Sequence, residues 1–462
     1  MRMQRFEVPG LAHYSYLLAC GGQAVVVDPK RDVDTYVDYA AANSLKITRI
    51  IETHIHADYA SGARELAQAT GAEMWLSKHD AGEDFEYAFA HREFGDGDEL
   101  RVGNIQIKAL YTPGHTPEHL SFVAHDLARG PHPMAMLSGD FLFVGSLGRP
   151  DLLGEQAKRK LAEQLYDSMK QRIAALPDGV EVHPAHGAGS MCGSGMGERP
   201  QSTLGYERLA NAFFAHTDRE KFIEHILSTV PPFPDYYRRM KRVNSAGPKV
   251  LGGIPGGEML SPQSFRNMMK KEGAVVIDLR RPESFGGAHI PGALSIGAGT
   301  AFATWASWVV PYDRPLLLVG DDSTDYESAR RALIRVGLDD VRGTLEGGMR
   351  TWIEAGFEEA SLPQISVAEV AGRVAAGAFL LDVRSDAEWN SGRAAGAQHI
   401  MAGDLAARTG ELPNGKPIVV MCASGYRSSV ASSVLRRAGF TDVTNVAGGM
   451  NAWRQQRLPT VS

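Results

Sequence analysis

The chain has 462 residues, a formal net charge of -6, 44% hydrophobic residues and 22% charged residues. This length exceeds what one hydrophobic core usually supports and indicates about three domains of roughly 150 residues each. The composition is that of an ordinary globular protein and lacks the basic excess of a phosphate-binding surface, so nucleic acid is not expected as a partner.

Localisation and redox state follow from simple features of the sequence. The first ten residues contain no apolar signal region, and no later segment keeps about 18 apolar residues in a row. A cytoplasmic protein without a membrane partner is therefore expected. The three cysteines, Cys20, Cys192 and Cys422, are odd in number and far apart, which argues against a disulfide framework. Cys20 precedes a Gly-Gly turn where a small apolar residue would also serve, and no chemistry is assigned to it.

The first part of the chain predicts a sandwich of sheets and helices. Short β-rich runs, such as 23–28 and 105–110, alternate with helical stretches and with loops that carry His and Asp. This pattern predicts an α/β domain over residues 1–243. Gly and Pro crowd the stretch that follows, and residues 244–257 are predicted to be a linker.

An internal repeat fills the rest of the chain. The run Val275-Val-Ile-Asp-Leu-Arg280 matches Leu380-Leu-Asp-Val-Arg384, and Gly347-Gly-Met-Arg-Thr-Trp352 matches Gly448-Gly-Met-Asn-Ala-Trp453. Two similar domains are therefore predicted, over residues 258–361 and 362–462.

Each repeat alternates strands with helices. The strand predicted at 418–421, for example, leads into a helix predicted from Ser428 to Ala438. This alternation favours a parallel sheet with helices on both faces.

Four short motifs in the first domain place His and Asp directly after apolar runs. A single motif of this kind is weak evidence, but four ligand-bearing loops in order predict one metal site where strand ends converge. Other histidines, such as His13, His79, His91 and His132, are expected to face solvent. The four motifs are Thr53-His-Ile-His-Ala-Asp-Tyr59, Thr112-Pro-Gly-His115, Leu137-Ser-Gly-Asp140 and His183-Pro-Ala-His186.

These motifs resemble the metallo-β-lactamase superfamily, whose pattern is His-x-His-x-Asp-His, then Gly-His-Thr, Gly-Asp and a late His. The resemblance covers the N-terminal half and implies an αββα sandwich. Tyr59 stands where hydrolases of this superfamily carry a His that helps to bind a second metal. A full dinuclear zinc site is therefore not expected.

Within the superfamily, residues 143–152 and 183–192 resemble loops of the persulfide dioxygenases. This resemblance implies one Fe(II) per chain, held by His54, His115 and Asp140. Two imidazoles and one carboxylate suit non-haem Fe(II) and leave positions open for O2, as co-substrate, and for a sulfur anion.

Further residues are expected close to the metal, where they would orient its ligands. Cys192 either reaches the metal pocket, as in dioxygenase–rhodanese fusions of the CstB type, or is only a buried thiol. Arg149 either binds a carboxylate of a thiol carrier or is a solvated surface residue. The residues expected near the metal are His56, Asp58, Tyr59, His186 and Cys192.

The last domain carries the best candidate nucleophile, Cys422, between the end of a strand and the start of a helix. Backbone N–H groups and a helix start stabilise a thiolate and a persulfide. The segment resembles the active loop of rhodaneses, and 448–453 resembles their C-terminal signature. Four residues separate Cys422 from Arg427, one fewer than in rhodanese-like phosphatases, which favours sulfur over phosphate. The persulfide loop comprises Ala423, Ser424, Gly425, Tyr426, Arg427 and Ser428.

The middle repeat lacks this nucleophile. Its matching stretch runs from Leu318 to Asp325, and the cysteine position falls at or beside Gly320. The carboxylates of this stretch would also repel a persulfide anion. The domain thus resembles the inactive rhodanese of the CstB-type fusions and is expected to be a spacer, a docking surface or a dimer contact.

These features predict an enzyme of sulfide detoxification with two activities, persulfide dioxygenase (sulfur dioxygenase) and thiosulfate sulfurtransferase (rhodanese). A low-molecular-weight thiol persulfide of glutathione, coenzyme A or cysteine type would be oxidised by O2 to sulfite. Cys422 would pass a sulfane sulfur to sulfite, giving thiosulfate. A homo-oligomer is expected. Two alternatives stay open: a zinc-dependent thioester hydrolase of glyoxalase II type fused to a sulfurtransferase, and a binding or sulfur-relay protein with a vestigial metal site.

Overall fold

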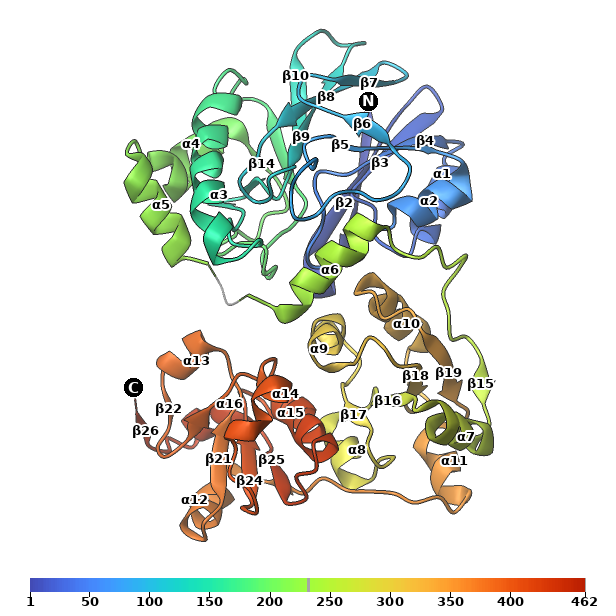
Figure 1. The fold of residues 1–462 in the computed structure, drawn as a ribbon, viewed down its shortest axis with the longest axis vertical. Coiled ribbons are helices and arrows are strands. Elements are labelled where there is room, and N and C mark those ends of the chain that lie inside the picture. Colours follow the sequence, from blue (N-terminus) through green and yellow to red (C-terminus); the bar gives the residue numbers. More distant parts are fainter. Residues whose placement is uncertain (231–232, 462) are drawn as a thin grey trace. The chain divides into compact units, whose positions relative to one another are not determined.

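Residues 1–230 and 233–461 are described by the computed structural model (Figure 1). They divide into two units, the first made of residues 1–253 with 334–337 and the second of residues 254–333 with 338–462. No helix in the described part of the chain is both long and apolar enough to span a membrane.

The first sheet of the first unit has six strands in sequence order. Its first three strands pair antiparallel and the later ones pair parallel. Helices α1 (Asp34–Ala42) and α2 (Ala63–Thr70) pack on its outer face (Figure 1). The strands are β1 (Arg2–Val8), β2 (His13–Cys20), β3 (Gln23–Val27), β4 (Lys46–Ile51), β5 (Glu73–Ser77) and β6 (Arg92–Phe94).

The second sheet also has six strands, in the order β14-β13-β10-β9-β8-β7, and a two-stranded ribbon of β11 and β12 lies beside it. Helices α3 (Glu155–Asp167), α4 (Leu204–Ala210) and α5 (Arg219–Ser228) lie beyond its outer face (Figure 1). The strands are β7 (Glu99–Val102), β8 (Ile105–Tyr111), β9 (Leu120–Asp126), β10 (Pro133–Gly139), β11 (Leu142–Phe143), β12 (Ser146–Leu147), β13 (Glu181–Pro184) and β14 (Ser202–Thr203).

Residue periodicity explains why the two sheets face each other. In β8, Ile105, Ile107 and Ala109 alternate with polar neighbours, and this apolar face is fully buried against the other sheet. The outer face of the first sheet packs on α2, and Val26 of the sheet and Leu66 of the helix belong to one hydrophobic cluster. Helix–sheet–sheet–helix layering results, so the predicted αββα sandwich is confirmed.

Helix α6 (Asp235–Ala246) follows the sandwich and presents one buried stripe to it. Tyr237, Lys241 and Asn244 recur at helical spacing and are each at most 2% exposed. The helix runs into the segment predicted as a linker, so residues 244–246 are helical and Asn244 belongs to the first domain's core. Residues 247–257, by contrast, contain no helix or strand.

The second unit contains two five-stranded parallel sheets, one from each repeat. In the middle repeat the order is β15-β19-β18-β16-β17, and every pairing is parallel. Its elements are β15 (Met259–Leu260), α7 (Pro262–Glu272), β16 (Val275–Asp278), α8 (Pro282–Gly287), β17 (Leu294–Ser295), α9 (Phe302–Val309), β18 (Leu316–Val319), α10 (Tyr326–Arg335), β19 (Val341–Leu345) and α11 (Gly348–Glu354).

The last repeat has the same topology, with the order β20-β25-β24-β21-β23 and parallel pairing throughout this sheet. The prediction of two α/β domains with parallel sheets is confirmed. The elements are β20 (Gln364–Ile365), α12 (Val367–Ala375), β21 (Phe379–Asp382), α13 (Asp386–Asn390), β22 (Arg393–Ala394), β23 (Gln398–His399), α14 (Leu405–Arg408), β24 (Ile418–Met421), α15 (Tyr426–Arg437), β25 (Val443–Val446), α16 (Gly449–Gln455) and β26 (Thr460–Val461).

Candidate functional site

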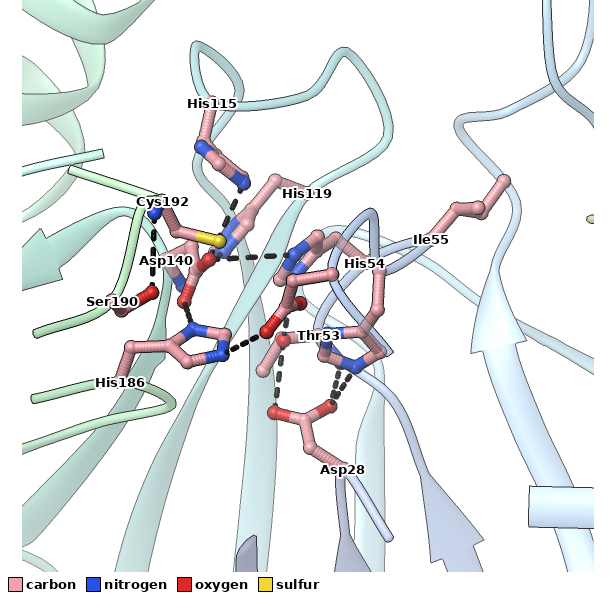
Figure 2. A network of polar contacts seen from close by, with 12 residues as sticks. Asp28, Thr53, His54, Ile55, His115, His119, Asp140, His186, Ser190 and Cys192 are labelled. Atoms are coloured by element: carbon pink, nitrogen blue, oxygen red, sulfur yellow. Dashed lines mark hydrogen bonds and ion pairs between the residues drawn. The ribbon is translucent and has the colours of Figure 1, made fainter. Parts of the chain in front are cut away.

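The His and Asp motifs of the first domain meet where strands of both sheets end. His54 follows β4, His115 lies in the loop between β8 and β9, and Asp140 follows β10. Figure 2 shows their side chains turned toward one another, with His186 beside Asp140. Because these loops leave the same edge of the sandwich, residues up to 86 positions apart form one cluster, from His54 to Asp140.

Three side-chain atoms at the centre of this cluster are placed so that they could bind one metal ion. Nε2 of His54 and Nε2 of His115 lie 3.8 and 3.4 Å from Oδ2 of Asp140. All three atoms are buried, and none has a hydrogen-bond partner among the described residues. A buried polar atom without a partner costs about 1–3 kcal/mol, so three of them converging on one point fit a metal ligand set.

Hydrogen bonds behind the two imidazoles fix which nitrogen faces the ion. Nδ1 of His115 donates to the carbonyl of Arg149 at 2.9 Å, which leaves Nε2 as a bare acceptor. The hydroxyl of Thr53 donates to Oδ2 of Asp28 and is thereby set to accept from Nδ1 of His54. Both rings therefore present a lone pair on Nε2, which is the state that binds a metal.

Gly148 makes the first of these arrangements possible. A Cβ atom at this position would lie 1.9 Å from the carbonyl oxygen of Asp140 and 2.9 Å from Nδ1 of His115. The backbone that orients His115 can thus approach the ligands only where there is no side chain.

His119 also belongs to the site and is not among the residues that the sequence predicts there. Its Nε2 accepts the backbone N–H of Asp140 at 3.1 Å, and its Nδ1 bonds the hydroxyl of Thr112. Burial lowers the pKa of His119 to about 3, so the ring is neutral and can accept that N–H. Its spacing four residues after His115 was the available signal.

His186 lies between two carboxylates of the site. Its Nδ1 donates to Oδ1 of Asp140 at 2.7 Å and its Nε2 donates to Oδ2 of Asp58 at 2.8 Å. Burial opposes protonation, but the two carboxylates raise the pKa of His186 well above its usual value. His186 therefore ties Asp140 to Asp58 as an imidazolium.

His56 and Tyr59 lie next to the ligands, and the ring centroid of His56 is 4.2 Å from that of His54 and 4.5 Å from that of Tyr59. Nε2 of His56 donates to Asp28, whose carboxylate raises the pKa of this imidazole against the effect of burial. The hydroxyl of Tyr59 donates to the carbonyl of Asp28 at 3.2 Å. Burial raises the pKa of Tyr59 well above its usual value, which favours the neutral phenol.

His13 corrects one expectation from the sequence. It was predicted to face solvent, yet it is fully buried, with its ring centroid 4.1 Å from that of Tyr59 and 5.4 Å from that of His186. The reason is the long pairing of β1 with β2, which places the start of β2 against the loop of His186. His79 and His91 are half-buried, and His132 is exposed.

Cys192 lines the site as well. Its Sγ lies within 4.8 Å of ligand atoms of Asp58 and His186, and Figure 2 shows the thiol turned toward the metal-binding side chains. Burial and the carboxylates of Asp58 and Asp140 raise the pKa of the Cys192 thiol well above its usual value. Asp58, His186 and Cys192 thus form a second group of donor atoms beside the first.

Arg149 is not a solvated surface residue, because it is only 1% exposed. Its guanidinium donates to both carboxylate oxygens of Asp151 and to the carbonyl of Met191, and its backbone N–H donates to the carbonyl of Cys192. Arg149 therefore anchors the Cys192 loop and, through its own carbonyl, His115. Binding of a substrate carboxylate by Arg149 stays a prediction.

The buried stripe of α6 forms a wall behind the ligand loop. Lys241 donates to the carbonyl of Ile55 at 3.0 Å, and the Asn244 amide donates to the carbonyls of His56 and Tyr59. One turn earlier, the hydroxyl of Tyr237 lies 3.8 Å from Sγ of Cys192. From the sequence alone this helix is not recognisable as part of the site, because its polar stripe resembles a solvated face until the fold buries it.

The candidate nucleophile of the last domain sits at the base of its loop. Sγ of Cys422 accepts the backbone N–H of Gly425 at 3.1 Å and the hydroxyl of Ser428 at 3.3 Å. The Arg427 guanidinium makes two 2.6 Å bonds to the carboxylate of Glu388. The predicted persulfide loop thus forms a cradle of donors around one sulfur atom.

The Gly-Gly signature has a physical cause. A Cβ atom at Gly449 would lie 2.2 Å from the carbonyl oxygen of Cys422, and φ at this residue is +50°. The close approach lets the backbone N–H of Met450 donate to that carbonyl at 2.7 Å. The signature therefore fixes the backbone of the nucleophile.

The middle repeat places Gly320 where the last repeat has Cys422. Val319 and Met421 take equivalent positions, since each pairs with the strand-ending Asp of its own repeat. A Cβ atom at Gly320 would lie 2.5 Å from Oγ1 of Thr324, so the side chain of Thr324 fills the space that a cysteine would need here.

Comparisons with known proteins agree with both halves of this architecture. The family described as the metallo-beta-lactamase superfamily matches residues 8–186, and the rhodanese-like domain matches 261–355 and 366–456. A crystal structure of a metallo-beta-lactamase from Staphylococcus aureus subsp. aureus COL has a TM-score of 0.65 and 34% identity, and the match covers 74% of this chain and 98% of that one.

The curated relatives include hydroxyacylglutathione hydrolases. The one from Polaromonas sp. (strain JS666) is 31% identical over 177 residues, which is 38% of this chain and 62% of the relative. The one from Anaeromyxobacter dehalogenans (strain 2CP-C) is 31% identical over 208 residues, which is 45% of this chain and 74% of the relative. The chain thus spans a little under two thirds of the first relative and nearly three quarters of the second. The chain belongs to the metallo-beta-lactamase superfamily and carries two rhodanese-like domains in its second half.

Proposed function

We propose that this chain is a persulfide dioxygenase–rhodanese fusion of the CstB type. In the first domain, one Fe(II) would be held by His54, His115 and Asp140, and a low-molecular-weight thiol persulfide would be oxidised by O2. In the last domain, Cys422 would transfer sulfane sulfur to the sulfite formed. The thiol carrier would be of the glutathione, coenzyme A or cysteine type.

One observation carries the proposal. Two imidazole nitrogens and one carboxylate oxygen converge, buried and without hydrogen-bond partners among the described residues, while both ring nitrogens of the neighbouring His186 are bonded to carboxylates. His186 uses both ring nitrogens on Asp140 and Asp58, and Tyr59 replaces the additional His. This supports one metal with a two-His, one-carboxylate ligand set, the set typical of non-haem Fe(II).

The overall chemistry balances. A persulfide R–S–SH, O2 and water give the thiol R–SH and sulfurous acid, so the outer sulfur loses four electrons and O2 accepts them. Fe(II) in such a ligand set supplies redox chemistry with O2 that a zinc ion does not. The chain's own residues keep both imidazoles in the metal-binding tautomer through Thr53 and Arg149.

The second reaction uses the Cys422 loop. The thiolate attacks the outer sulfur of a second persulfide, the S–S bond to the carrier breaks and the carrier thiol leaves. The N–H of Gly425 and the hydroxyl of Ser428 point at the sulfur and stabilise its negative charge. Sulfite then attacks the outer sulfur of the enzyme persulfide, thiosulfate leaves and the thiolate of Cys422 returns.

Metal analysis of anaerobically purified protein, combined with oxygen uptake, tests this proposal. We expect about one iron per chain and uptake of one O2 per persulfide oxidised. When persulfide is in excess and thiosulfate is the product, this corresponds to one O2 per two persulfides consumed. Two zinc ions per active chain, with hydrolysis of a glutathione thioester and no oxygen uptake, would contradict it. That result would favour the alternative suggested by the names of the curated relatives, a glyoxalase II-type hydrolase fused to a sulfurtransferase.

A further inference from the structure

The persulfide loop of the last repeat is held by the repeat that has no nucleophile. We propose that the middle repeat is a positioning element for Cys422, acting through Gly297, which anchors Tyr426, and through Ser295, which anchors helix α15. The proposal rests on the proposed sulfur-transfer function and deepens it. It assigns a role to a domain that cannot itself carry sulfur, because Gly320 stands where Cys422 would be.

The first contact joins the loop itself to the middle repeat. The hydroxyl of Tyr426 donates to the backbone carbonyl of Gly297 at 2.9 Å. Gly297 is buried, and a Cβ atom there would lie 3.3 Å from Cε2 of Tyr426 and 3.0 Å from the carbonyl oxygen of Arg280. The ring of Tyr426 therefore rests directly on this glycine.

The second contact joins the helix that continues the loop. The backbone N–H of Ser295 donates to Oγ of Ser433 at 3.0 Å, and Oγ of Ser295 bonds Oγ of Ser429 at 2.8 Å. All three serines are at most 1% exposed. Hydrogen bonds that are shielded from water are strong, so these bonds hold the first turns of α15 in place against the end of β17.

Apolar packing connects the repeats as well. One hydrophobic cluster contains Ile290 and Ala293 of the middle repeat together with Ala431 and Leu435 of α15. The two repeats therefore share a core around this helix. Loop, helix and core all receive support from the domain without a thiol.

These anchors lie next to the groups that touch the sulfur. Gly425, whose N–H bonds Sγ, precedes Tyr426 directly, and Ser428, whose hydroxyl bonds Sγ, precedes Ser429 directly. Arg427, by contrast, is hydrogen-bonded within its own repeat, to Glu388. Because stabilisation of a charge by fixed donors depends on sub-ångström placement, loosening Tyr426 should weaken both bonds to the thiolate.

Two variants test the inference from opposite sides of the contact. Tyr426→Phe removes the hydroxyl and keeps the ring, while Gly297→Ala crowds the ring from the middle repeat. Each has a matched control. Tyr326→Phe removes a tyrosine hydroxyl that contacts the backbone of Gly320 within the middle repeat, and Gly287→Ala adds a methyl group where no atom lies within 4 Å.

The readout is the pH at which the Cys422 thiolate forms, followed by the ultraviolet absorbance that thiolates have and thiols lack. Each variant is compared with the same variant carrying Cys422→Ser, which isolates the signal of this one cysteine. We expect thiolate formation to move to higher pH in Tyr426→Phe and Gly297→Ala but not in the two controls. Sulfurtransferase kcat/KM should fall about tenfold in both, below the roughly 100-fold that a 1 Å misplacement can cost.

Unchanged titration and unchanged kcat/KM in both test variants would overturn the inference. A shift in the controls as large as in the test variants would overturn it too, because the effect would then be general loosening of the repeats. The titration needs no turnover. If the wild-type protein shows no sulfurtransferase activity, the proposed function fails, while a titration shift confined to the test variants would still support positioning by the middle repeat.

Discussion

Nδ1 of His115 donates to the backbone carbonyl of Arg149 at 2.9 Å, and this bond decides which nitrogen of the ring faces Asp140. The guanidinium of the same arginine donates to the carbonyl of Met191, next to Cys192. A metal ligand and the thiol-bearing loop are therefore anchored on one residue, and the geometry of the site depends on bonds behind the ligands as much as on the ligands themselves.

Removal of a ligand should separate the two activities. His115→Ala deletes one of the three converging donors, so we expect loss of bound iron and of persulfide-dependent oxygen uptake. Thiosulfate sulfurtransfer should stay within about twofold of wild type, because Cys422 lies in a separately packed domain. Iron content, oxygen consumption and sulfurtransfer measured on one preparation check this. A parallel loss of both activities would show that the sites depend on each other.

Removal of a bond behind a ligand should have a smaller effect. Thr53→Val keeps the shape of the side chain but deletes the hydroxyl that accepts from Nδ1 of His54. Loss of such a partner typically costs 10- to 100-fold in metal affinity, and we expect a loss of that order. Thr53→Ser restores the hydroxyl and serves as the control. Iron affinity measured by chelator competition tests this prediction. Equal affinity in wild type, Thr53→Val and Thr53→Ser would refute the role of Thr53.

The proposed relay predicts a change of product rather than of rate. Cys422→Ser has nearly the same size but cannot form a persulfide, so oxygen uptake should persist while sulfite replaces thiosulfate. Cys20→Ser, in which a half-exposed thiol outside both sites is changed, should behave like wild type. Anion chromatography of the products provides the measurement. Undiminished enzymatic thiosulfate from Cys422→Ser would rule out the relay.

The loop of the middle repeat should be free to vary. Asp321 and Asp322 are exposed and follow Gly320, where no thiol is present. We expect Asp321→Asn and Asp322→Asn to leave oxygen uptake and sulfurtransfer within about twofold of wild type, as is usual for exposed positions that cost at most about 0.5 kcal/mol. A substantial fall in sulfurtransferase rate would mean that this loop takes part in sulfur transfer.

The pair of Arg427 and Glu388 predicts a pH dependence of stability. The hydrogen bonds from Arg427 lower the pKa of Glu388 to about 2, below the ordinary value of 4.5. The pair therefore contributes its full stabilisation above about pH 4.5, and the contribution is lost as the pH falls toward 2. Since the carboxylate is partly exposed, we expect only about 1 kcal/mol.

Thermal unfolding of wild type and Glu388→Gln between pH 8 and pH 3 measures this difference. The variant should be less stable by a constant amount at neutral pH, and the difference in stability should narrow between pH 4.5 and pH 3. A gap that is the same at pH 3 as at pH 7 would contradict the assignment.

Local patterns in the sequence determined the layers and the chemistry-bearing loops. Alternation in β8 and the buried run of β3 predicted strands because a period of two, or a short apolar run, suits one element of a packed sheet. The repeated Gly-Gly-Met signature predicted two like domains because the close approach at Gly449 tolerates no side chain. The motifs of His54, His115 and Asp140 likewise predict which side chains can bind a metal, because residue types are read directly from the sequence.

Only the tertiary structure decided how these groups are oriented and which others join them. His13 and Lys241 carry no local sign of their place, because each is brought to the site by an element distant in sequence from its neighbours there. Arg149 reads as a surface residue until the Cys192 loop covers it. The support of Tyr426 by Gly297 depends on a contact 129 residues apart in the chain. Periodicity and motifs encode what one element does, whereas burial and partner choice arise only when elements pack.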